Sequence, residues 1–207
     1  MKLSTLFSRC LAAEYREVEE GASFSLSRTG NKLTVFLEDS NGALDWKNNA
    51  DFPAVARMRE GKRVFLCHRG FLRVFSALLP YVTEALADKS LRAIDVVGYS
   101  HGAALAVLLY EYVWESRPDL RGALHGYGFG CPRVIFGILT PALQRRFLNF
   151  LVIRNREDAV THLPPTFLGY RHIGQMLTVG EHGKYSPIDA HRPENIYREL
   201  CLYEEGL

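Results

Sequence analysis

The sequence lacks any long hydrophobic run, since none of its 207 residues lie in an apolar stretch near the roughly 18 residues that a membrane-spanning helix needs. It also lacks the continuous apolar core of an export signal, because Ser8 and Arg9 interrupt the first apolar stretch and charges follow from Glu14. We therefore interpret the N-terminus as mature protein and expect an amphipathic helix there. A cytoplasmic location is expected, with non-classical export as the alternative.

Cysteine pairs, repeats and linkers are also missing. The four cysteines are scattered, without a CxxC motif or a short Cys/His spacing, which predicts reduced and mostly buried thiols and no zinc site. There is no internal repeat, low-complexity tract or Ser/Gly linker, so we predict a single domain over 1–207.

The composition shows no excess of charge of either sign. The formal net charge is +2, and 47% of the residues are hydrophobic against 23% charged, which is ordinary for a soluble globular protein with a full core. This balance gives no reason to expect nucleic acid as a partner.

Strand-like and helix-like segments alternate along the chain. The predicted strands are Lys32–Leu37, Arg63–Cys67, Ala93–Gly98, Ala123–Phe129, Phe150–Arg154 and Arg171–Val179. The predicted helices are Gly70–Asp88, Gly102–Trp114 and Pro193–Tyr203. This order predicts an α/β fold with a mainly parallel central sheet flanked by helices.

The stretch VVGYSHGA at Val96–Ala103 places a serine between a buried strand and an apolar helix. Gly98, Ser100 and Gly102 form the G-x-S-x-G pattern of a nucleophile elbow, in which the glycines leave room for a tight turn. The helix N-terminus adds a positive end that stabilises developing negative charge. The alternative is that the two glycines only allow the strand and helix to pack closely.

A serine nucleophile needs a histidine base and a carboxylate that orients this histidine, in the chain order Ser, Asp/Glu, His. Asp158 follows the predicted strand Phe150–Arg154, and Glu157 is its local competitor. The histidines downstream are His162, His172, His182 and His191. His191, directly before the terminal helix, is favoured over His182. His101 is disfavoured as the base because it adjoins the serine and cannot easily reach its hydroxyl.

Five motifs in order resemble the class 3 lipases, the α/β-hydrolase family that includes the fungal triacylglycerol lipases. GYSHGAALA resembles the family's elbow GHSLGGALA, and GFGCPRV at Gly128–Val134 resembles its FGxPRV motif. DAVTHLPP from Asp158 resembles the segment that carries the family's acid. YRHIG at Tyr170–Gly174 resembles a structural strand motif, which implies that His172 is not the base. His191 with Tyr197 resembles the terminal catalytic segment.

The resemblance also implies an oxyanion hole. Ser40 in LEDS occupies the place of the family's F-R-G-[ST] residue whose amide and hydroxyl stabilise the oxyanion, and the second amide would be that of His101. Glu38-Asp39 replaces Arg-Gly at this place. Two carboxylates beside the hole oppose an anion unless they point outward or pair with a base such as Lys47.

The segment Asn41–Glu60 corresponds to the family's lid region. Its apolar residues, among them Trp46 and Phe52, fit either a mobile cover over an acyl pocket or an ordinary connecting helix with its apolar face in the core. Both interpretations remain open at this point.

The resemblance implies a serine hydrolase that cleaves carboxylic esters of lipids such as acylglycerols, through Ser100, His191 and Asp158 and an acyl-enzyme, without metal or cofactor. The expected partner is a small-molecule lipid ester, with transient contact to a lipid surface. Phospholipase or thioesterase chemistry on the same triad is an alternative, because fold and triad do not separate them. A third interpretation is a non-catalytic lipid-binding protein that kept the fold.

Overall fold

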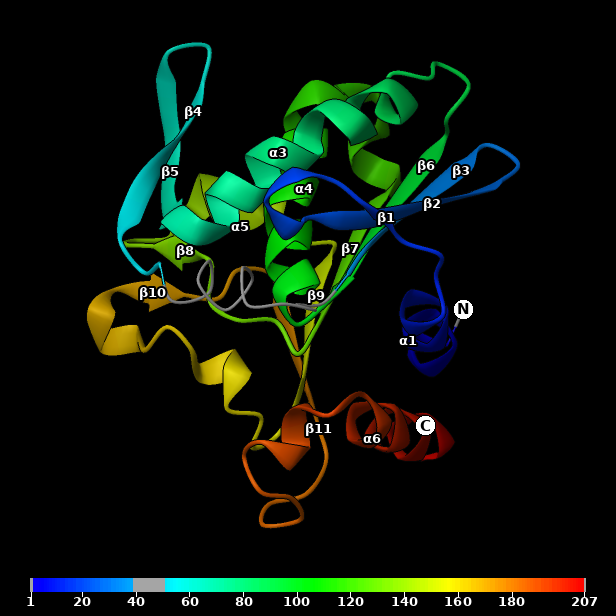
Figure 1. Cartoon of the computed structure of the whole chain (residues 1–207), viewed down its shortest axis with the longest axis vertical. Helices are drawn as coiled ribbons and strands as arrows, with labels where there is room; N and C mark the ends of the chain where they lie inside the picture. The colour runs from blue at the N-terminus through cyan, green and yellow to red at the C-terminus, as the bar shows by residue number, and fades with distance from the viewer. Residues whose placement is uncertain (1, 39–50, 207) are drawn as a thin grey trace.

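The computed structural model describes residues 2–38 and 51–206, which form two β-sheets and the helices that cover them (Figure 1). The main sheet contains, in spatial order, β1 (Arg16–Glu17), β2 (Ser23–Thr29), β3 (Lys32–Leu37), β6 (Ala93–Tyr99), β7 (Leu124–Phe129), β9 (Phe150–Asn155) and β11 (Gln175–Val179). The second sheet contains β10 (Tyr170–Arg171), β8 (Ile135–Phe136), β5 (Lys62–His68) and β4 (Ala54–Arg59).

The main sheet is parallel from β3 to β11, and at one edge β2 pairs antiparallel with both β3 and β1. The α-helices are α1 (Leu3–Leu11), α3 (Arg69–Leu86), α4 (His101–Ser116), α5 (Pro141–Arg146) and α6 (Pro193–Glu205). Short 3₁₀ turns are η1 (Glu19–Gly21), η2 (Pro118–Ala123), η3 (Val160–His162), η4 (Thr166–Leu168) and η5 (Asp189–His191). The predicted α/β fold, with a mainly parallel sheet flanked by helices, is therefore confirmed.

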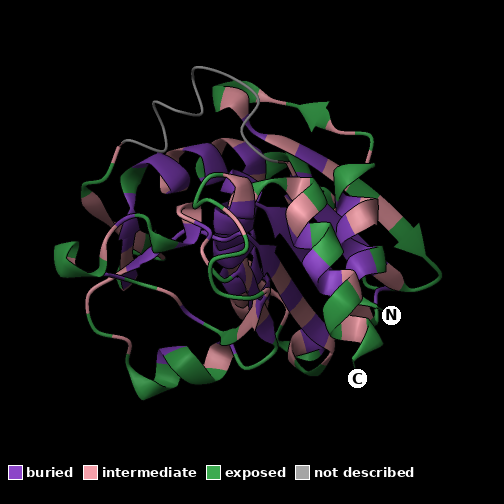
Figure 2. Ribbon diagram, turned by 90° about the horizontal axis from the view of Figure 1, so that it is seen from below, coloured by how far each residue is buried: buried purple, intermediate pink, exposed green. Residues whose placement is uncertain are grey.

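The helices bury both faces of the main sheet, as the purple centre of Figure 2 shows. Alternate side chains of β6 point to opposite faces, so Val96 joins the cluster under α3 and α4 while Val97 joins the cluster under α1 and α6. Both side chains are fully buried. A strand covered on both faces explains the unbroken apolar run that the sequence shows there.

Two expectations about individual elements are wrong. Arg171–Val179 is not one strand, because Gly174 has φ +100° and divides it into β10 and β11, which lie in different sheets. The interpretation of Asn41–Glu60 as a connecting helix fails where the segment is described, because Ala54–Arg59 is strand β4, paired antiparallel with β5. Residues 39–50 lie outside the described residues, so the mobile-cover interpretation stays a prediction.

Within the described residues, no helix combines the length and the apolar character needed to cross a membrane. The four cysteines are free thiols, three of them buried and Cys201 partly exposed. Burial raises the pKa of Cys67 to about 12 and also raises that of Cys131. Both thiols therefore stay protonated at neutral pH.

Candidate active site

Ser100 occupies a strained turn between β6 and α4. Its backbone has φ 53° and ψ −117°, a conformation that L-residues rarely adopt, and its amide donates to the carbonyl of Phe129 at 2.9 Å. The two flanking glycines permit this turn. A Cβ on Gly98 would lie 2.2 Å from the carbonyl oxygen of Gly102, and one on Gly102 would lie 2.2 Å from that of Leu37.

His191 connects Ser100 and Asp158 through its two ring nitrogens. Its Nε2 lies 2.8 Å from Ser100 Oγ, and its Nδ1 lies 2.8 Å from Asp158 Oδ2. The three residues come from loops after β6, β9 and β11, which end at the same edge of the parallel sheet. The structure thus brings together the three side chains that the sequence analysis selected, and Ser100 can pass a proton to His191 while Asp158 holds the opposite N–H.

Asp158 is fixed by its own loop. Its side chain is completely buried, its Oδ1 accepts the amide of Val160 at 2.9 Å, and its carbonyl accepts the hydroxyl of Thr161 at 2.8 Å. The competing carboxylate, Glu157, instead accepts the amide of Gly183 at 2.8 Å. These contacts leave the second oxygen of Asp158 to His191.

The other candidate histidines lie elsewhere. Burial lowers the pKa of His172 to about 4, and its Nε2 lies 2.8 Å from the carbonyl of Thr161. His182 is almost fully exposed, with Nδ1 3.4 Å from Glu157. His162 also has a lowered pKa through burial. His101 is buried edge-on against Phe71, and burial lowers its pKa to about 4.

Of the two residues expected at the oxyanion hole, the structure describes His101 and does not describe Ser40. His101 is the first residue of α4, so its amide lies at the positive end of that helix, where amides have no intrahelical acceptor. Ser40 lies outside the described residues, as do Asp39 and Lys47. The described chain reaches half-buried Glu38, whose carbonyl oxygen would be 2.4 Å from a Cβ on Gly102. The chain thus runs beside the elbow two residues before Ser40.

Three residues at the site were not assigned a role from the sequence: Tyr99, Gly130 and Asn155. Tyr99 donates its hydroxyl to the carbonyl of His191 at 2.6 Å, and Asn155 donates to the carbonyl of Ala190 at 3.1 Å. Gly130, with φ +57°, lies so close that an added Cβ would be 2.8 Å from Cε1 of His191. The resemblance of GFGCPRV to the family's FGxPRV motif pointed to the surroundings of Gly130, whereas the roles of Tyr99 and Asn155 depend on contacts across the fold.

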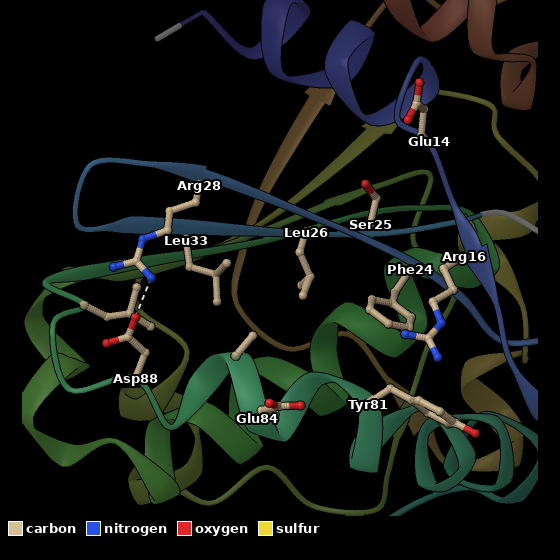
Figure 3. Close-up of a pocket in the computed structure, with 12 residues that line it drawn as sticks. Glu14, Arg16, Phe24, Ser25, Leu26, Arg28, Leu33, Tyr81, Glu84 and Asp88 are labelled. Atoms are coloured by element: carbon tan, nitrogen blue, oxygen red, sulfur yellow. Dashed lines mark hydrogen bonds and ion pairs between the residues drawn. The ribbon is translucent and has the colours of Figure 1, made fainter.

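A separate groove of about 750 Å³ lies between β2 and α3 and contains none of the three triad residues. Phe24, Leu26 and Leu33 point from the sheet toward α3, and an ion pair between Arg28 and Asp88 lies at one end (Figure 3). Its lining mixes apolar and charged side chains, and none of its residues belongs to the loops after β6, β9 and β11.

The family model described as "Lipase (class 3)" matches residues 34–168, more than half of the chain, including Ser100 and Asp158. A fungal lipase solved with an inhibitor is similar over 91% of this chain and 83% of its own, with a TM-score of 0.73 and 18% identity. A Rhizopus microsporus var. chinensis lipase is similar over 94% and 75%, with a TM-score of 0.67 and 18% identity.

The mono- and diacylglycerol lipase of Aspergillus oryzae is similar over 86% of this chain and 66% of its own, with a TM-score of 0.65 and 20% identity. No curated protein sequence matches this chain. At these identities the structural likeness establishes the fold.

Replacing Gly130 with alanine is expected to slow the reaction of Ser100 with a fluorophosphonate at least tenfold, because the new Cβ would displace His191. Gly30→Ala is the matched control, since Gly30 has the same φ of +57° but nothing within 4 Å of the added Cβ. Both variants should lose about 1 kcal/mol of stability through positive φ. Equal labelling rates in the two variants would contradict the packing argument.

The stability of the fold is expected to fall as the pH drops from 6.5 to about 4. Burial lowers the pKa of His101 from 6.5 to about 4, so the unfolded state binds more protons in this window. The loss for this histidine is about 1.4 kcal/mol per pH unit. In urea unfolding at pH 7 and pH 5, the free energy of unfolding of His101→Leu should fall less between the two pH values than that of the parent chain. An equal fall in both proteins would show that His101 is not the source of the pH dependence.

Proposed function

This chain belongs to the class 3 lipase family and is a hydrolase of lipid esters, and we propose that Ser100, His191 and Asp158 perform the reaction, with acylglycerols as the substrate class. The observation that carries the proposal is the unbroken path of two 2.8 Å contacts from Asp158 through His191 to Ser100. This path supplies a nucleophile, a base and an orienting carboxylate in one place.

The reaction follows from this geometry. Ser100 Oγ attacks the ester carbonyl carbon as its proton passes to Nε2 of His191, and Asp158 stabilises the imidazolium through Nδ1–H. The tetrahedral intermediate collapses to an acyl-serine when His191 gives the proton to the departing alcohol oxygen. Water, deprotonated by the same Nε2, then attacks the acyl-serine and releases the fatty acid, which restores Ser100.

The oxyanion formed in both steps is assigned to the amides of His101 and Ser40. The position of His101 at the start of α4 supports the first assignment, and the path of the chain from the end of β3 to Glu38, beside Gly102, supports the second. Each such donor is worth about 3 kcal/mol of transition-state stabilisation.

We also propose that the rim of the site touches lipid surfaces during turnover. Ile188, three residues before His191, is 75% exposed, and Phe167, in η4 after the Asp158 loop, is 85% exposed. Leu163 and Leu168 of the same loop are also exposed. Large apolar side chains exposed on the segments that follow Asp158 and precede His191 favour contact with an apolar interface over contact with water.

Ser100→Ala is the direct test of the catalytic assignment. The variant should fold, because a hydroxyl is simply removed from a small side chain, and hydrolysis of a nitrophenyl butyrate should fall by at least 1,000-fold. A folded variant that keeps the parental rate would show that another residue is the nucleophile. Failure of the parent chain to label with a fluorophosphonate would instead favour the non-catalytic lipid-binding alternative.

Ile188→Ser should lower activity on emulsified triacylglycerol severalfold and leave the rate on a soluble short-chain ester within about twofold, because the change removes apolar contact area of the rim only. Leu148→Ser is the matched control. Leu148 is 58% exposed and precedes β9, at the opposite end of that strand from the Asp158 loop. Equal losses on emulsion in both variants would refute contact through the rim.

A further inference from the structure

The segment that carries His191 is held by two side chains acting on consecutive carbonyl groups. Tyr99 donates its hydroxyl to the carbonyl oxygen of His191 at 2.6 Å, and Asn155 donates its amide to that of Ala190 at 3.1 Å. Both carbonyls belong to η5, the short 3₁₀ turn before α6. A single turn has little stability of its own, so these two donors restrict where its last residue can lie.

The ring of His191 is confined as well. The ring of Tyr99 stacks on it, with centroids 5.2 Å apart and an angle of 24° between the planes. The backbone of Gly130 also lies close to the imidazole, since a Cβ added to Gly130 would be 3.0 Å from Nδ1 of His191. Tyr99 therefore contacts both the backbone and the imidazole of the same residue.

Tyr99 can do this because of its position in the chain. It is the last residue of β6, directly before Ser100, and its side chain points to the face of the sheet that α1 and α6 cover. Phe7 of α1 packs edge-on against its ring at 5.5 Å, and its side chain is buried. The strand that presents the nucleophile thus also presents a rigid group that holds the base.

We propose that Tyr99, assisted by Asn155, is a positioning residue that sets the orientation of the His191 imidazole toward Ser100 Oγ. The inference rests on the proposed function of Ser100 and His191. The family's GHSLGG elbow has a histidine where this chain has Tyr99, so the phenol that makes this contact comes from this chain's own sequence.

The proposal predicts a specific kinetic signature. The 2.8 Å distance from Nε2 to Oγ is what allows proton transfer, and a small rotation of the imidazole lengthens it. Acylation requires this transfer, whereas binding of the substrate's acyl chain does not. Loss of the Tyr99 hydroxyl should therefore lower kcat and the rate of fluorophosphonate labelling together, and leave KM nearly unchanged.

Tyr99→Phe tests this prediction, because it removes only the hydroxyl and keeps the ring. We expect kcat on a soluble nitrophenyl ester to fall about 5- to 30-fold, with KM within about twofold. Tyr110→Phe is the matched control. Tyr110 is also buried and also donates its hydroxyl to a backbone carbonyl, that of Arg146 at 3.0 Å, but its ring packs against Phe147 and Phe150 and not against a residue of the triad.

Both Phe variants should show similar small losses of thermal stability, and only Tyr99→Phe should lose kcat. Equal effects of the two variants on kcat would overturn the proposal, as would a Tyr99→Phe effect confined to KM or to stability. In a His191→Ala background, Tyr99→Phe should no longer change the residual rate, because its action passes through His191. An active Ser100→Ala variant would overturn the proposed function itself, independently of these results.

Discussion

The imidazole of His191 is the group on which the site depends, because it has to reach two partners from different loops at once. Its two nitrogens lie 2.8 Å from Ser100 Oγ and from Asp158 Oδ2, and a displacement that shortens one contact lengthens the other. The surrounding structure can be understood as the set of constraints that hold this one ring in place.

Those constraints come from the parallel sheet. Strands β6, β7, β9 and β11 are neighbours and end at the same edge, so the loops that follow them meet there. Ser100 follows β6, Gly130 follows β7, and Asp158 follows β9. The covering helices bury both faces of the sheet, and this rigid core gives the loops fixed starting points.

The positions that carry strain or close packing lie at the same edge. Ser100 has φ 53°, and the two elbow glycines are so tightly packed that no larger residue fits without movement. Such strain is stored where a functional group must be presented in one orientation, and the buried core offsets its cost. The groove between β2 and α3 has no strained nucleophile or paired base among its residues (Figure 3).

The sequence by itself determined the alternation of strands and helices, the elbow at Ser100 and a short choice of partners for it, two acids and four histidines, because these depend on local periodicity, on glycine spacing and on chain order. The tertiary structure alone decided that Asp158, and not Glu157, faces His191, that Arg171–Val179 divides at Gly174, and that Ala54–Arg59 pairs as a strand. It also decided that Tyr99 and Asn155 hold the base. These outcomes depend on contacts between residues far apart in the chain, which leave no local pattern in the sequence.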